Sequence, residues 1–398
     1  MAMKSFDIAV IGAGIVGSCA ALSLARAGYR VALVEAHEAK PWSEEVSDLR
    51  VVALATDNQK LLGACGVWEK IASRRAQSYS DMRIWDAAAG NELHLSASQQ
   101  AQESLGSIIE NNNIADALWQ AIKQENRIQC FCPDRLESIE QENIVSLKLK
   151  SGDTIKAGLV LGADGASSKV RELLGLKSDK KDYGQRGIVA YVKTESEHQN
   201  TAWQRFLPTG PLAFLPFSDG RCSIVWTLPD EEADRLLQCD DESFCRELTR
   251  AFDGRLGNVV TVSMRAAFPL QRQLSKEMLV GRVALIGDAA HIVHPLAGQG
   301  VNLGLRDVSA LLDVLGAAKS SSESTKQKNE VSFSQHKLER WARQRISENA
   351  IAAYSFEAIN RAFSNDEVLP TLLRGHAFGI ANFLSPLRSL LLRQASGS

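Results

Sequence analysis

The first 35 residues alternate short apolar runs with one helical stretch. Residues 6–11 and 29–35 are mostly apolar and have the length of buried parallel strands, while the apolar spacing of residues 14–27 is that of a helix. Gly28 follows at a position where helices commonly stop. The order of strand, helix and strand predicts a βαβ unit.

A different pattern, of short strands separated by turns, occupies the middle of the chain. Two antiparallel strands are predicted at residues 82–85 and 93–95. Four more are predicted between residues 187 and 228, at 189–192, 201–206, 213–216 and 223–227. Together these segments indicate a separate sheet made of antiparallel strands.

The remaining elements follow from the same periodicities. A helix is expected over residues 108–124, where Ile114, Leu118 and Ile122 share one face, and a long helix over residues 336–363. The other expected elements are a hairpin of residues 144–150 and 154–156, a strand at 159–161, a solvated turn at 177–181, a buried strand at 283–286, a helix from about Gly300 and an exposed loop at 319–329.

The composition is that of a globular protein larger than one ordinary domain, with 398 residues, of which 45% are apolar and 23% charged. The net charge of −2 and the lack of basic clusters interleaved with aromatic residues argue against nucleic-acid binding. No apolar run reaches the roughly 20 residues of a membrane-spanning helix, and the N-terminus lacks signal-peptide features.

The cysteines argue against a metal site. There are seven, and none lies in a C-x-x-C pair or at another zinc-ligand spacing. The only close pair, Cys130 and Cys132, has the alternation of a strand. No metal is expected, and a reducing compartment fits best.

A glycine-rich turn follows the first predicted strand, where residues 12–17 read GAGIVG. Gly12 permits a tight turn, Gly14 lets the backbone approach a pyrophosphate, and Gly17 allows close packing of helix on strand. The N-terminus of the following helix attracts phosphate. Glu35, at the end of the second strand, can accept both hydroxyls of an adenosine ribose, which predicts FAD or NAD binding.

A second glycine-rich segment begins after the buried strand at 283–286. Residues 287–291 read GDAAH, and residues 298–302 read GQGVN. Asp288 can accept a hydrogen bond from the ribityl chain of a flavin, and Gly298 and Gly300 let backbone amides approach its ring. The positive N-terminus of the next helix suits the negative charge of reduced flavin. The alternative is a glycine-rich turn that only begins a helix.

A third segment lies between these two. Residues 162–165 read GADG after a predicted strand, and Ser168 and Arg171 follow. An Asp-Gly turn is ordinary turn chemistry, but Arg171 can also pair with a pyrophosphate.

The three segments in this order resemble the class A flavoprotein aromatic hydroxylases of the para-hydroxybenzoate hydroxylase type. The D-G-x-x-S-x-x-R motif of that family is met at 164–171, and its G-D-A-A-H…P…G-x-G-x-N motif at 287–302. The resemblance implies tightly bound FAD and a transient NADPH or NADH. It assigns Asp164 and Arg171 to both cofactors, and places Val301 and Asn302 at the FAD.

A narrower resemblance, to the ubiquinone-biosynthesis hydroxylases, covers nearly the whole chain. It rests on residues 47–54, 109–111, 117–119, 203–206, 223–226 and 295–300. It implies that Arg50 and Gln120 lie along the FAD.

The expected fold is α/β, with a Rossmann-like FAD-binding domain of the glutathione reductase type, an inserted, mostly antiparallel substrate domain and a C-terminal helical segment. The FAD-binding domain is assigned to 1–75, 100–180 and 275–345, the substrate domain to 76–99 and 181–274, and the C-terminal segment to 346–398.

The implied activity is hydroxylation of the ring of a polyprenylated phenol or quinol in ubiquinone biosynthesis. NAD(P)H would reduce the flavin, O₂ would add to it, and a flavin hydroperoxide would transfer an oxygen atom. Because the flavin does this chemistry, no catalytic side chain is required. Candidates near the ring are His294, Pro295 and Gly298, whereas His291 is expected to be a packing residue. The candidate substrate-lining residues are Phe206, Phe214 and Trp226, with plain core as the alternative.

The stretch 371–393 has an apolar stripe flanked by Arg374, Arg388 and Arg393. Pro386 predicts two short helices rather than one. The stripe fits docking on the protein's own core or on a partner, as a homo-oligomer or in a complex with other quinone-biosynthesis enzymes. It also fits contact with an anionic membrane. A prenylated substrate favours the membrane, so the expected location is cytoplasmic, with peripheral contact at the inner membrane.

Other functions on the same fold stay open. A prenyl reductase or a flavin-binding subunit that does not hydroxylate would share these motifs. A flavin halogenase is disfavoured because the W-x-W-x-I-P signature is absent around Trp226.

Overall fold

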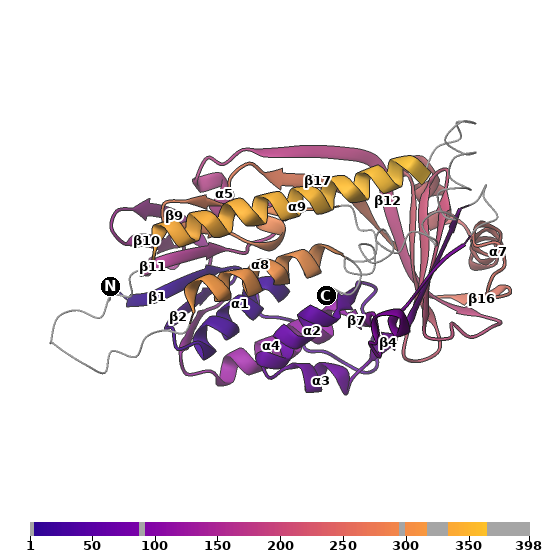
Figure 1. Ribbon diagram of the computed structural model, residues 1–398, viewed down its shortest axis with the longest axis horizontal. Helices are drawn as coiled ribbons and strands as arrows, with labels where there is room; N and C mark the ends of the chain where they lie inside the picture. Colours follow the sequence, from indigo (N-terminus) through magenta and orange to yellow (C-terminus); the bar gives the residue numbers. More distant parts are fainter. Residues whose placement is uncertain (1–3, 87–91, 294–298, 317–332, 364–398) are drawn as a thin grey trace.

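The computed structural model describes residues 4–86, 92–293, 299–316 and 333–363. In these residues the fold is α/β, with two large sheets side by side (Figure 1). The long helix α9 (Gln335–Phe363) extends along both of them (Figure 1). It contacts α8 (Gln299–Leu315) and β18 (Leu279–Val280) at the first sheet, and β13 (Thr201–Leu207), β14 (Gly210–Pro216) and β17 (Ala266–Ser275) of the second.

The first sheet contains eight strands of the described chain, with the order β18-β19-β11-β1-β2-β8 and with β10 and β9 joined at β11. The pairs β1–β2, β1–β11, β2–β8 and β11–β19 are parallel. The bounds are β1 Lys4–Ile11, β2 Val31–Val34, β8 Ile128–Phe131, β9 Leu136–Gln141, β10 Val145–Leu149, β11 Thr154–Gly162, β18 Leu279–Val280 and β19 Val283–Leu285.

Three helices pack together beside this sheet, with α1 (Ile15–Arg26) between α4 (Asn111–Gln124) and α8 (Gln299–Leu315). The middle of α1, residues 17–25, is buried, because small residues there allow the helix to lie close to the sheet. The short helix α5 (Lys169–Leu173) follows β11.

The second sheet has the order β20-β17-β12-β15-β14-β13-β5-β6, with β16 paired to β12. Its pairs are antiparallel except β5–β13. Helices α6 (Asp230–Gln238) and α7 (Asp241–Ala251) cover one face, where they share an apolar core with the sheet. The bounds are β5 Asp81–Asp86, β6 Glu92–Ser96, β12 Ser178–Thr194, β13 Thr201–Leu207, β14 Gly210–Pro216, β15 Cys222–Pro229, β16 Val259–Val262, β17 Ala266–Ser275 and β20 His291–Ile292.

A small antiparallel sheet of β3 (Val51–Ala55), β7 (Gly106–Glu110) and β4 (Ala76–Tyr79) lies near the second sheet. Helices α2 (Thr56–Ala64) and α3 (Trp68–Ala72) follow β3 in the chain. The short 3₁₀ turns are Ala97–Gln100 and Gly287–Ala289.

Most predicted elements are confirmed, including the first βαβ unit, the antiparallel strands, the hairpin of β10 and β11, and the helices α8 and α9. The predicted strand at 159–161 is the end of β11, which runs on from the hairpin as one strand. The loop expected at 319–329 lies outside the described residues.

Two predicted elements are wrong. Residues 108–110 belong to strand β7, not to the following helix, and this strand is fully buried because it pairs with β3 and β4. A fully buried strand is apolar at successive positions, so local periodicity cannot separate it from a helix. Residues 178–182 pair with β17 at the start of β12, although their side chains are mostly exposed.

Candidate cofactor and substrate site

A groove of about 860 Å³ lies at the carboxyl ends of the parallel strands. Its lining includes Ala13, Glu35, Ala163 and Ile286, which lie one or two residues after the ends of β1, β2, β11 and β19. Ligands of open α/β sheets bind at this edge, and the volume lies within the range of small-molecule sites.

The glycine-rich turn between β1 and α1 forms one wall, and each of its glycines has a different role. Gly12 has a φ of +101°, and a Cβ there would lie 2.4 Å from the carbonyl oxygen of Ala163. A Cβ at Gly17 would lie 2.0 Å from the carbonyl oxygen of Gly12, so α1 can approach the turn only without a side chain. A Cβ at Gly14 would meet nothing within 4 Å, and Gly14 lines the groove.

These environments predict different effects for the same substitution at two glycines. Gly17→Ala should destabilise the fold by about 1–3 kcal/mol, because the added methyl group overlaps backbone. Gly14→Ala should leave stability nearly unchanged, because Gly14 has an ordinary φ of −64°. It should weaken FAD binding about tenfold, since the methyl group occupies the groove. Urea unfolding and FAD titration of the apoprotein measure the two effects. Equal stability loss in both variants would contradict this prediction.

Glu35 fixes the turn from the end of β2. Its carboxylate accepts hydrogen bonds from the backbone amides of Ala13 (2.5 Å), Ala36 (2.7 Å) and His37 (3.1 Å). Glu35 also lines the groove, where it was predicted to meet a ribose.

Asp288 places an exposed carboxylate in the groove. It has no hydrogen-bond partner in the described part of the chain. The groove walls partly desolvate this carboxyl group and raise its pKa, an effect that His291 opposes. A carboxylate in this setting is available to hydroxyl donors of a bound molecule.

Two further polar groups were missed by the sequence reasoning. Asn111 and Asn112 begin α4 and line the groove, and the Oδ1 atom of each is buried without a hydrogen-bond partner in the described structure. Buried acceptors of this kind are costly unless a ligand or water satisfies them. The available signal was the polar run Asn111–Asn113, which would have stood out once β7 was recognised as a strand.

The loop before β3 carries Arg50 to the groove and is held by a buried carboxylate. Glu110, with no exposed surface, accepts hydrogen bonds from the backbone amide of Asp48 (2.7 Å), from Trp42 Nε1 (3.2 Å) and from Arg75 Nε (3.0 Å). Asp48 then accepts from the backbone amide of Arg50 (3.0 Å). Arg50 lines the groove and keeps an exposed guanidinium.

The polar side chains of the D-G-x-x-S-x-x-R motif form hydrogen bonds with other groups of the protein. Asp164 accepts hydrogen bonds from Ser168 Oγ (2.5 Å) and from the backbone amides of Lys169 (2.6 Å) and Val170 (3.0 Å). Arg171 is buried and donates to the carbonyl oxygens of Ala166 (2.6 Å) and Ala289 (2.7 Å).

The side chains of Asp164 and Arg171 do not line the groove, so their expected contact with the cofactors stays a prediction. The bond from Arg171 to Ala289 ties the turn after β11 to the turn that carries Asp288. Gly165 is the residue of the D-G-x-x-S-x-x-R motif that lines the groove.

The side chains of Asn302 and Gln120 also form hydrogen bonds away from the groove. Asn302 is fully buried and bonds Ala53 O, Ala55 N and Asn58 Nδ2, which clamps α8 to β3 and α2. Gln120 bonds Asp116 and Lys70, more than two helical turns beyond Asn111. Neither side chain lines the groove, so their predicted contact with FAD has no support from the groove lining and stays a prediction. Val301 does line it, and Gly300 lies in the first turn of α8.

The predicted ring-side candidates His294, Pro295 and Gly298 lie outside the described residues. His291 is a packing residue, as predicted. It is buried, and its Nε2 lies 2.6 Å from Oδ2 of the buried Asp307. Asp307 also accepts from the backbone amide of Gly287 (3.0 Å) and from Arg345 Nε (2.7 Å).

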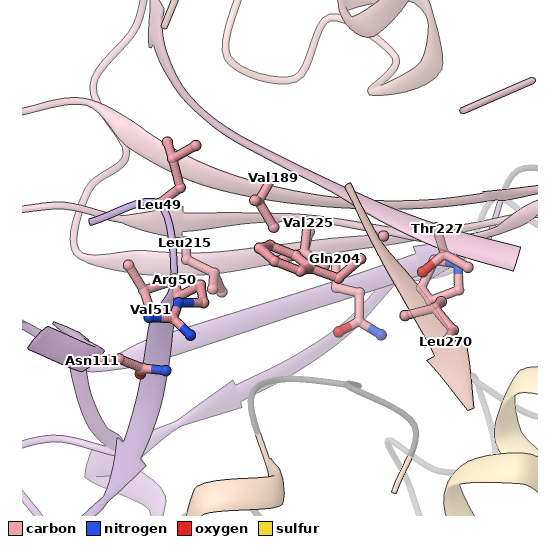
Figure 2. Close-up of a pocket in the computed structure, with 14 residues that line it drawn as sticks. Leu49, Arg50, Val51, Asn111, Val189, Gln204, Leu215, Val225, Thr227 and Leu270 are labelled. Carbon is pink, nitrogen blue, oxygen red and sulfur yellow. The ribbon is translucent and has the colours of Figure 1, made fainter. Parts of the chain in front are cut away.

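A second, smaller cavity of about 210 Å³ adjoins the groove (Figure 2). The two share Leu49, Arg50, Asn111 and Phe268 in their linings. The rest of the smaller cavity is lined by the second sheet and by β3, mostly with apolar side chains: Val51, Gly187, Val189, Gln204, Pro211, Ala213, Leu215, Val225, Thr227 and Leu270.

The aromatic residues proposed to line the substrate cavity do not line it. Phe214 stacks on Phe252 at 3.7 Å between ring centroids, and Trp226 meets Phe244 edge-on at 6.0 Å. Both belong to the core under α6 and α7, on the opposite face of the sheet. Phe206 is buried and is also absent from the cavity lining.

In the described residues, no helix is long and apolar enough to cross a membrane. The same residues contain no group of three or more His, Cys, Asp or Glu side chains that could hold a metal ion.

Comparison with known proteins gives three concordant matches. The model of a family described as an FAD binding domain matches residues 5–327. The chain is 34% identical over 374 residues to the 3-demethoxyubiquinol 3-hydroxylase of Escherichia coli, covering 94% of this chain and 93% of that protein. It is 33% identical to the ubiquinone hydroxylase UbiL of Rhodospirillum rubrum, covering 99% and 90%.

Among solved structures, the p-nitrophenol 4-monooxygenase PnpA of Pseudomonas putida has a similar fold. Its TM-score is 0.74 with 19% sequence identity, and the match covers 99% of each chain.

Proposed function

The chain belongs to the FAD-binding-domain family of flavoprotein aromatic hydroxylases, and we propose that it is an FAD-dependent monooxygenase that hydroxylates the ring of a polyprenylated phenol or quinol in ubiquinone biosynthesis. The observation that carries this proposal is the apolar cavity that shares four lining residues with the cofactor groove. A ring in that cavity would lie next to the cofactor.

FAD fits the groove by the chemistry of its walls. The open surface at Gly14, beside the N-terminus of α1, suits a pyrophosphate. The carboxylates of Glu35 and Asp288 suit ribose and ribityl hydroxyls. The unpaired oxygens of Asn111 and Asn112 supply further acceptors.

Bound FAD, reduced by NADH or NADPH, supplies the electrons with which O₂ is activated to give one oxygen atom to the ring. The chain itself binds and orients. Arg50 and Asn111 line both spaces and so can contact cofactor and substrate together. The apolar walls, among them Val189, Leu215 and Val225, exclude water from the reacting ring.

The assignment of residues to two domains is part of the proposal. Residues 1–75, 100–180 and 275–345 would form the FAD-binding domain, and residues 76–99 and 181–274 the substrate domain. The positions of the two large sheets support this assignment. The segment 346–398 begins within α9, and its residues beyond 363 lie outside the described part.

Peripheral contact with the cytoplasmic face of the inner membrane, through residues 371–393, rests on the sequence alone. So does association with a second copy of the chain or with other enzymes of the pathway. Sedimentation with anionic vesicles, compared between the full chain and a variant in which Arg374, Arg388 and Arg393 are replaced by glutamine, tests the membrane contact.

Purified protein is expected to show the absorbance bands of oxidised flavin and to hold stoichiometric FAD. With NADH or NADPH, O₂ and a short-chain prenylphenol, it should form a hydroxylated product whose new oxygen comes from O₂. Labelled O₂ and mass spectrometry measure this. A reduced product formed without O₂ would indicate a prenyl reductase instead. Bound FAD with no product from any prenylphenol would contradict the proposal.

A further inference from the structure

Gln204 places an unpaired amide in the smaller cavity. It lies on β13 with 8% of its surface exposed, and it lines the cavity. No hydrogen bond joins its side chain to any described residue. Its strand neighbours face the other way, since Trp203 lies in the core under α7 and Arg205 donates to the carbonyl oxygen of Ala251 (2.9 Å).

The surroundings of this amide are apolar. Val189, Ala213, Leu215, Val225 and Leu270 line the same cavity. Leaving a nearly buried amide without a partner is unfavourable, so such groups are normally paired. In ligand cavities with apolar walls, the few polar groups are those that fix the orientation of the ligand.

Gln204 also differs by its position from Arg50 and Asn111, two other polar residues of the cavity. Arg50 and Asn111 line the cofactor groove as well, whereas Gln204, like Thr227, lines only the smaller cavity. Figure 2 shows its amide between the end marked by Arg50 and Asn111 and the end marked by Thr227 and Leu270. A molecule that fills the cavity therefore meets this amide along its length.

We propose that Gln204 is a specificity-determining residue that hydrogen-bonds the ring hydroxyl of the phenol substrate and so selects the ring carbon turned toward the cofactor groove. The assignment rests on the proposed function. An amide suits this role because Oε1 accepts from a phenol O–H, while Nε2 donates to the phenol oxygen or to an adjacent ring oxygen. The apolar walls hold the ring but cannot distinguish its orientations.

The test compares binding of a phenol and of its methyl ether. The probes are 2-prenylphenol with one isoprene unit and the corresponding O-methyl ether, titrated calorimetrically into the FAD-loaded protein. The unchanged protein should bind the phenol about tenfold more tightly, because the ether has no O–H to donate. In Gln204→Leu this preference should fall to about twofold or less.

A second readout measures how much of the NAD(P)H oxidation is coupled to hydroxylation. In Gln204→Leu, the fraction of oxidised NAD(P)H that yields hydroxylated product should fall and released H₂O₂ should rise, because the ring is held less well. Gln271→Leu makes the same change at an exposed position of β17 outside the cavity, and should leave both readouts unchanged. Gln204→Met, which keeps the side-chain length, gives the same comparison if the leucine variant folds poorly.

Each outcome has one meaning. A tenfold preference that persists in Gln204→Leu or Gln204→Met would overturn the assignment, as would equal binding of phenol and ether by the unchanged protein. If the unchanged protein bound neither probe and hydroxylated no prenylphenol, the proposed function itself would fail, and the assignment with it.

Discussion

Replacing Asp307 with alanine is expected to lower the free energy of unfolding by about 3–5 kcal/mol, the cost of removing one partner from a buried ion pair. Asp307 is fully buried and holds His291, Arg345 and the backbone amide of Gly287 at 2.6–3.0 Å. Arg345 keeps a bond to Asn349, but it loses the carboxylate that faces it in the interior. Urea unfolding followed by circular dichroism measures the loss.

The same cluster predicts a dependence of stability on pH. Burial alone would raise the pKa of Asp307, but His291, Arg345 and the Gly287 amide outweigh it and hold the pKa below its ordinary value. The stabilisation is therefore present above the pKa of an unfolded aspartate, about 4, and is lost as the pH falls through the lower, folded value. In Asp307→Ala this contribution to acid sensitivity should be absent.

Asp313 provides the matched control, because it is exposed on the same helix, α8. Asp313→Ala should change stability by less than about 0.5 kcal/mol. A loss of less than about 1 kcal/mol in Asp307→Ala would mean that the cluster does not hold the Gly287–Ala289 turn as described.

Replacing Asp288 with alanine is expected to raise the dissociation constant for FAD about 100-fold while the protein stays folded. The Asp288 carboxylate lines the groove without a described partner, so its removal breaks no internal bond. Hydrogen bonds to a charged group contribute about 1.5–3 kcal/mol each, and 1.4 kcal/mol corresponds to a factor of ten. Fluorescence titration of the apoprotein with FAD measures the constant, and thermal unfolding checks the fold.

Asp288→Asn keeps one acceptor oxygen and should give an intermediate loss. It also isolates the effect of pH. Because the pKa of Asp288 is raised, affinity for FAD should be full above that value and should fall as the pH drops through it, when the carboxyl group binds a proton. The asparagine variant should lack this dependence. Stoichiometric, tightly held FAD in Asp288→Ala would remove Asp288 from the FAD site.

Local patterns predicted the parts of the site that depend on neighbouring residues. The turn of Gly12, Gly14 and Gly17 was recognised because the backbone geometry of a single βαβ unit requires glycine at these three positions. Glu35 followed from its place at the end of the second strand. Asp288 was recognised for the same reason, after the strand that became β19.

The errors have a common cause in side-chain direction. Arg171 suited a phosphate by charge, but in the fold it reaches Ala289, which is 118 positions away in the chain. Gln204 and Phe214 lie on paired strands. Helices α6 and α7 cover one face of that sheet, and this leaves the other face turned toward the groove. Successive strand residues point to opposite faces, so the wrong choice of face exchanges lining for core.

Local sequence patterns were enough to predict the βαβ unit, the glycine-rich turn that lines the groove and the presence of a second, antiparallel sheet. Each of these depends on periodicity or on backbone geometry over a few consecutive residues. The packing of distant segments places Asn111 and Asn112 at the groove, gives Asp164 and Arg171 hydrogen-bond partners within the protein, and places the amide of Gln204 in the smaller cavity. Those assignments depend on which distant segments meet, and packing between whole elements sets that.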